Sequence, residues 1–223
     1  MRSAAQPWIA IVAALLTLAQ PLFAFQSPLS DESVREAYFL GQRHDGSLAE
    51  LVEKSTQRFP APQNGPYISS VMFVTPFVSA ALLSSGYVGN YSAQQAELDH
   101  RQSGKEIVEI TVEIQLTESY GQFVTPARAN SRSSSTSVLI PRPPDFWRDF
   151  RVQIFNGDQA LSNSVYHGSP NYSCGDYGSC VLTGATLTFE FPADAFSDDS
   201  ANVRVDPPEG ETVTANFDVT RLR

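Results

Sequence analysis

The amino-acid sequence predicts a mainly β protein of the α+β class, an antiparallel two-sheet β-sandwich with helices near its N-terminus. The first observation is a set of four runs in which apolar and polar residues alternate, at 105–118, 150–154, 187–191 and 213–219. Such alternation places one face of a strand in a core and the other in water. The second observation is that clusters of Gly, Pro, Asn and Asp separate the runs, which favours antiparallel strands in two packed sheets.

The clearest predicted strand covers 105–118, where five aliphatic residues alternate with polar ones: Val108, Ile110, Val112, Ile114 and Leu116. Shorter apolar runs at 138–140, 180–182 and 203–205 predict further strands. The segment 67–74 (YISSVMFV) is rich in strand-forming residues but lacks clean alternation. It therefore predicts a strand that is covered on both faces.

A helical hairpin is predicted within residues 25–62, packed on the main body of the protein. Ser30 is a capping residue that precedes two acidic residues and a helically spaced apolar stripe. A second helix begins near Ser47 and must end before Pro60, because proline breaks a helix.

One further helix is predicted at 92–103. Ser92 is its capping residue, Gln95 completes a capping box, and Gly104 supplies the stop. The apolar segment 77–85 (FVSAALLSS) fits either a short helix or a strand, and its periodicity does not decide between them.

Residues 1–24 are predicted to be a signal peptide that is removed on export. Arg2 supplies a positive start, an uncharged apolar run covers 8–18, and Ala24 is a small residue at the expected cut. Gln20 and Pro21 interrupt the apolar run before it reaches the roughly 20 residues that a spanning helix needs. We therefore expect a periplasmic or secreted protein without a stable membrane span in the mature chain.

The mature chain is acidic. Cleavage after Ala24 removes Arg2 and no acidic residue, which leaves 14 basic against 24 acidic side chains and a formal net charge of −10. An acidic surface repels phosphate backbones, so we expect no nucleic-acid partner. The most basic segment, which contains the Ser-rich stretch 127–137, holds few arginines and predicts a mobile surface loop of the sandwich domain 63–223.

The two cysteines, Cys174 and Cys180, are predicted to form a disulfide, because export delivers them to an oxidising compartment. A bond across so short a loop stabilises the fold by roughly 2 kcal/mol on the chain-entropy argument. The alternative is a metal site completed by His167 and Asp176, but the sequence lacks a second pair of ligands at metal-binding spacing.

The best candidate binding site is the segment 156–180, which the sequence predicts to be a long loop around the disulfide. It holds four residues suited to recognition: Tyr166, His167, Tyr172 and Tyr177. Long ordered loops are often functional, and tyrosine offers contact area at low entropic cost. We expect a protein or glycan partner, and the alternative is an irregular structural hairpin pinned by the disulfide.

No catalytic residue or cofactor is predicted. Glu109 and Glu113 share the wet face of one strand, but four residues along a strand span roughly 13 Å, too far for paired carboxylates. His44 and His100 each adjoin an aspartate, yet neighbouring side chains point apart, and no nucleophile motif is present. The alternative to a binding or structural module is therefore a hydrolase whose carboxylates converge only in the fold.

Two further features were weighed for function. Acidic residues gather near the C-terminus, and Asp194, Asp198 and Asp199 are candidate calcium ligands together with Asp206, Glu209 and Glu211, although the regular spacing of a calcium loop is absent. Trp147 is predicted to plug the edge of the sandwich rather than to be an exposed platform, because large aromatic side chains are more often buried.

Overall fold

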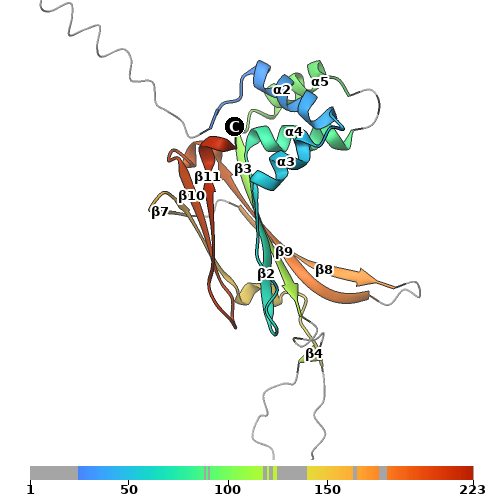
Figure 1. The fold of residues 1–223 in the computed structure, drawn as a ribbon, viewed down its shortest axis with the longest axis vertical. Helices are drawn as coiled ribbons and strands as arrows, with labels where there is room; N and C mark the ends of the chain where they lie inside the picture. The colour runs from blue at the N-terminus through green and yellow to red at the C-terminus, as the bar shows by residue number, and fades with distance from the viewer. Residues whose placement is uncertain are drawn as a thin grey trace, which may run out of the picture.

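A computed structural model of the protein describes residues 25–87, 89, 91–117, 120, 123–124, 140–162, 165–175 and 180–222. Within them, two antiparallel sheets pack face to face and four helices lie at one end of the sandwich (Figure 1). The predicted signal peptide, the Ser-rich stretch 127–137, Asp176 and Tyr177 lie outside the described residues. The predicted fold class is confirmed.

The larger sheet has five strands in the order β1-β2-β3-β9-β8. Their bounds are Thr56–Arg58 for β1, Pro66–Val74 for β2, Ile107–Leu116 for β3, Val165–Cys174 for β8 and Cys180–Pro192 for β9. The second sheet has the order β11-β10-β6-β7, and its strands are β6 (Arg151–Asn156), β7 (Gln159–Leu161), β10 (Ser200–Asp206) and β11 (Val213–Asp218). β4 (Phe123–Val124) and β5 (Ile140–Pro141) form a separate pair.

The sandwich core is built from the apolar faces that alternation predicted. On β3, the four residues Val108, Ile110, Val112 and Ile114 are completely buried. Aromatic contacts join the sheets, because Phe73 of β2 meets Phe217 of β11 at a ring-centroid distance of 5.5 Å. Burying each large apolar side chain contributes about 1.5–3 kcal/mol, so these faces decide how the sheets associate.

The helices α2 (Asp31–Gln42), α3 (Ser47–Lys54), α4 (Pro76–Gly86) and α5 (Ala93–Ser103) form a second cluster, which we call the helical lobe. The segment 77–85 is helical, because Thr75 caps it by accepting a hydrogen bond from the Val78 amide and Pro76 occupies its first turn. Ser92 caps α5 in the same way by accepting from the Gln95 amide.

The predicted pair α2 and α3 is part of this larger lobe rather than an isolated hairpin. A Cβ added to Gly41 of α2 would lie 1.9 Å from the Ser84 hydroxyl oxygen, so α2 and α4 are in close contact. Arg35 of α2 forms an ion pair of 2.7 Å with Glu97 of α5. β2 joins the two cores, since Phe73 lies in the sandwich core and Val74 in the lobe. The strand is buried on both faces only at this end, because Tyr67, Ser69 and Met72 on its second face are half-buried.

Trp147 plugs the edge of the sandwich, as predicted. It lies in the short 3-10 helix η2 (Phe146–Asp149), is buried, and belongs to the main core. A Cβ on Gly168 of β8 would lie 2.5 Å from the indole, so the ring rests directly on the β8 backbone. Two further short helices, η3 (Ala193–Ala195) and η4 (Val219–Arg221), flank β10 and β11.

The predicted long loop at 156–180 is wrong. Most of this segment is the regular strand β8, paired with β9 from Val165↔Glu190 to Cys174↔Cys180 and interrupted by a register shift between Asn171 and Tyr172. The predicted short run at 180–182 is the start of the thirteen-residue strand β9. Glycine and asparagine suggested a loop, but Gly168 is required under Trp147 and backbone pairing with β9 overrides the low strand propensity of the segment.

Candidate functional site

The β8–β9 hairpin extends away from the four-stranded sheet (Figure 1). We use "the hairpin" for the described residues of β8 and β9. The predicted disulfide Cys174–Cys180 is present and closes it near the tip. Among the described residues β8 is the last strand of its sheet, so no described strand pairs with one of its edges. A covalently closed, projecting edge is the feature of the predicted binding segment that the structure retains.

The two faces of β8 separate the predicted recognition residues. Tyr166 pairs with Phe189 and Tyr172 with Leu182, and because both partners are buried, the two tyrosines share the inner face. His167 pairs with Thr188 and therefore points to the outer face. The structure thus brings Tyr166 and Tyr172 to one face and places His167 on the other.

Tyr166 is held by its neighbours. Its ring stacks on Phe189 at 4.8 Å and meets Trp147 edge to face at 5.5 Å. Burial raises the pKa of the Tyr166 phenol above its ordinary value of 10.0, and the positive charge of Arg148 partly offsets that effect. Tyr172 is 51% exposed and Tyr166 40%. Tyr166 is therefore anchored, whereas Tyr172 presents half of its surface to solvent.

On the outer face of the five-stranded sheet, the carboxylates gain partners that sequence reasoning did not find. Glu109 lies directly opposite Glu190 of β9 in the strand register. Glu113 accepts hydrogen bonds from the Thr186 hydroxyl at 2.9 Å and the Asn171 amide at 3.3 Å. These contacts lock Glu113 into a polar network, which leaves Glu109 and Glu190 as the carboxylate pair that the fold assembles.

Glu190 also lines a hollow of about 660 Å³ beside the helical lobe, together with Glu106 and Asp194. Glu109 is not among the residues that line this hollow. Paired carboxylates cleave glycosides when both reach one bound sugar, at about 5–9.5 Å separation. Glu109 and Glu190 therefore do not both line this hollow, whereas Glu106, Glu190 and Asp194 do.

A histidine contact was missed from sequence. The Nε2 atom of His100 lies 2.9 Å from Glu106 Oε1, which also accepts a hydrogen bond of 3.0 Å from the Leu29 amide. The residue that could have predicted this contact is Gly104. A left-handed glycine after α5 turns the chain back and brings positions 100 and 106 together. The contact ties the entrance of α2, the end of α5 and the start of β3, which is a structural role.

The C-terminal acidic residues do not converge. Asp198 and Asp199 precede β10, whereas Glu209 and Glu211 follow it in the turn to β11. Seven residues of strand separate the two groups by roughly 20 Å. Over the ranges that the structure describes, no group of three or more His, Cys, Asp or Glu side chains is placed to hold a metal ion.

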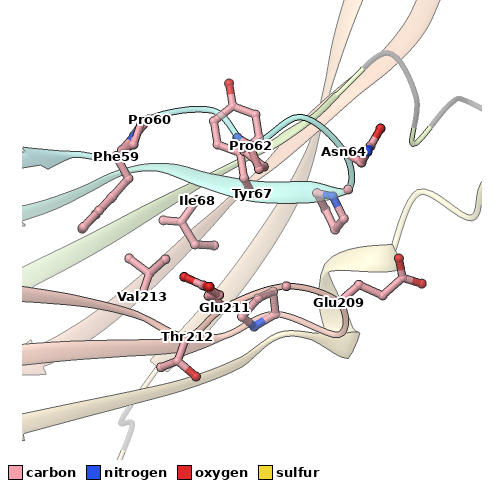
Figure 2. Close-up of a pocket in the computed structure, with 14 residues that line it drawn as sticks. Phe59, Pro60, Pro62, Asn64, Tyr67, Ile68, Glu209, Glu211, Thr212 and Val213 are labelled. Atoms are coloured by element: carbon pink, nitrogen blue, oxygen red, sulfur yellow. The ribbon is translucent and has the colours of Figure 1, made fainter.

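A second candidate surface is a groove of about 500 Å³ at the end of the sandwich far from the helical lobe. One wall is the connection from β1 into β2 and the other is the turn between β10 and β11 (Figure 2). Phe59, Ile68 and Val213 converge at one end of this groove, and Glu211 projects between the walls. Glu209 and Glu211 were predicted as calcium ligands, and no local sequence pattern predicts this groove.

In comparisons with known proteins, no family model matches the sequence, and none of the curated proteins matches it. Among the described residues, no helix is long and apolar enough to cross a membrane.

Proposed function

We propose that this protein is a non-catalytic module that binds a partner protein through the inner face and open edge of the hairpin. The observation that supports this best is the half-exposed Tyr172, which shares a strand face with the anchored Tyr166, roughly 20 Å along the strand. The strand is closed by the disulfide, and within the described residues no strand pairs with its outer edge. Tyrosines on rigid supports give large contact areas at low entropic cost.

The open edge of β8 favours a protein over a glycan as the partner. An edge strand offers a row of backbone donors and acceptors that another polypeptide strand can satisfy. A sugar ring can stack on Tyr172 but cannot continue the backbone ladder. The disulfide also supports the proposed periplasmic or secreted setting, because such bonds persist in oxidising compartments.

The test is a pull-down with the mature chain and its Tyr172→Ala variant, using extract from the compartment that holds the mature protein. Phe39→Ala is the matched control, because Phe39 of α2 is an aromatic residue with the same 51% exposure on the helical lobe. We expect Tyr172→Ala to lose a protein that the wild type and Phe39→Ala retain. Truncating a central aromatic contact commonly costs 2 kcal/mol or more, about a thirtyfold loss of affinity.

Identical recovery of every protein by Tyr172→Ala and the wild type would remove the hairpin face from consideration. Binding of the wild type to an immobilised glycan, lost in Tyr172→Ala, would instead replace the protein partner by a sugar.

A further inference from the structure

Within the part of the chain that the structure describes, no strand pairs with the edge of β11 along the groove. The side chain of Gln57 shows that this edge can form hydrogen bonds with a neighbouring amide. Gln57 of β1 accepts a hydrogen bond of 3.1 Å from the Asn216 amide and donates to the Asn216 carbonyl. A side-chain amide thus satisfies both backbone groups of one residue of β11, as a neighbouring strand would. β11 is the last strand of its sheet, so this contact closes only part of the edge.

Strand alternation extends the open edge toward the groove. Backbone groups of Asn216 point away from β10, and those of Thr214, two residues along, point the same way. β1 ends at Arg58, and the wall that continues from it is rich in proline, with Pro60, Pro62 and Pro66. Proline has no N–H to donate, so this wall is poorly suited to close on β11.

The floor of the groove is apolar. Phe59 and Val213 are only partly buried and pack against the main core, and Ile68 lies between them and the interior. An extended segment paired with β11 would send alternate side chains toward this floor, because the period of a strand is two. The groove therefore fits a strand that carries an apolar residue at every second position.

The rim of the groove is acidic. Glu209 and Glu211 are exposed, and neither forms an ion pair with a basic side chain within the described residues. Across a groove without basic side chains among its lining residues, these charges favour Lys or Arg on the face of the ligand that turns away from the floor.

We propose that the groove binds an extended, basic segment of a partner protein by strand addition to β11. The apolar residues of the segment cover Phe59, Ile68 and Val213, its lysine or arginine side chains meet Glu211, and its backbone pairs with Thr214. This site is distinct from the hairpin, which lies at the other edge of the five-stranded sheet.

The probe is a capped, fluorescently labelled peptide of about six residues that alternates lysine and valine, a length typical of a strand. Its binding to the mature chain is followed by anisotropy. Glu211→Lys is expected to weaken binding about tenfold or more, since it replaces a charge-assisted contact by repulsion. Asp158→Lys is the matched control, because Asp158 is exposed in the turn at the opposite end of the four-stranded sheet and changes the net charge equally.

Two further arms separate strand addition from simple charge attraction. Methylating alternate backbone nitrogens of the peptide is expected to abolish binding, and a peptide of glutamate and valine is expected to bind Glu211→Lys better than the wild type. The proposal is overturned if the wild type does not bind the lysine peptide saturably, or if Glu211→Lys and Asp158→Lys weaken it equally. Tyr172→Ala should leave binding of the lysine peptide unchanged. The groove proposal can therefore be tested independently of the hairpin proposal.

Discussion

Gly168 of β8 shows how one residue controls the packing of Trp147 at the edge of the sandwich. Its missing side chain makes room for Trp147, whose indole atoms would lie 2.5–2.7 Å from an added Cβ. The indole then supports Tyr166 from one side while Phe189 supports it from the other. The position of Tyr166 on the hairpin face thus depends on a glycine that is needed because it has no side chain, and not because of its backbone conformation.

Gly168→Ala is expected to lower the free energy of unfolding by about 1–3 kcal/mol, because the added methyl must displace a packed indole. Urea unfolding measures the change. Gly86→Ala is the control, since nothing lies within 4 Å of its added Cβ, and it should change stability by less than about 1 kcal/mol. Equal stability of Gly168→Ala and the wild type would contradict the packing role of Trp147.

The raised pKa of Tyr166 predicts how the stability of the protein changes at alkaline pH. Burial raises its pKa above 10.0, so the folded protein retains the phenol proton when the unfolded chain has lost it. The stability that this residue contributes is therefore fully present below about pH 10 and is lost as the pH rises through the folded pKa. Tyr91, whose pKa burial also raises, titrates in the same direction.

Ultraviolet absorbance of the phenolate follows this titration in the folded protein. Tyr166→Phe should reduce the amplitude that appears above pH 10, while the part due to Tyr91 remains. A difference curve between the wild type and Tyr166→Phe that is centred at or below pH 10 would show that the Tyr166 ring is open to solvent.

At the scale of elements, strand pairing converted a segment with loop composition into a hairpin. The ladder of backbone hydrogen bonds between β8 and β9 runs the full length of β8. It pairs backbone N–H and C=O groups that would bond to water if this segment were a loop. The disulfide closes the end of this ladder where the strands leave the main body (Figure 1). The hairpin is therefore the element whose order depends most on a covalent bond.

Replacing Cys174 and Cys180 by serine is expected to lower the unfolding free energy by roughly 2 kcal/mol, from the entropy of a short loop. Hydrogen exchange should become faster near the hairpin tip, at 171–175 and 180–184, and stay slow along β3. Loss of protection along β3, whose inner face is completely buried, would mean that the disulfide holds the whole sandwich rather than the hairpin alone.

At the scale of the whole molecule, the two apolar cores meet at the end of β2. β2 contributes Phe73 to the sandwich core and Val74 to the helical lobe. Thr75 follows at once, caps α4, and donates a hydrogen bond of 3.0 Å to the Leu222 carbonyl near the C-terminus. Because consecutive residues of β2 belong to different cores, one core cannot unfold without disturbing the other. The lobe and the sandwich should therefore unfold together.

Thr75→Val is expected to cost about 1–3 kcal/mol, because it removes a helix cap and leaves a buried carbonyl without its donor. Trp147 is the sole tryptophan after residue 24, so its fluorescence reports the sandwich while helical circular dichroism reports the lobe. Both transitions should shift together in Thr75→Val, and Thr220→Val, an exposed threonine near the same end, should shift neither. Separate midpoints for the two signals would show independent domains.

Much of this architecture follows from the sequence alone. The alternation at 105–118 predicted both β3 and its buried face, because period-two patterning is a local property of a strand. The caps at Ser30 and Ser92 predicted where α2 and α5 begin, since a cap bonds backbone groups within its own turn. The spacing of two cysteines after a predicted leader was enough to predict the disulfide.

Tertiary contacts decided what local patterns leave open. Whether 165–174 is a strand depends on its pairing with β9, so it could not be read from its own residues. The helix at 77–85 does have a local start signal in Thr75 and Pro76, which periodicity alone did not reveal. The pairing of Glu109 with Glu190 and the groove between Phe59 and Val213 join positions more than 80 residues apart. Periodicity and capping act over a few residues, whereas register and sheet packing choose neighbours across the whole chain, which is why only the tertiary structure revealed these surfaces.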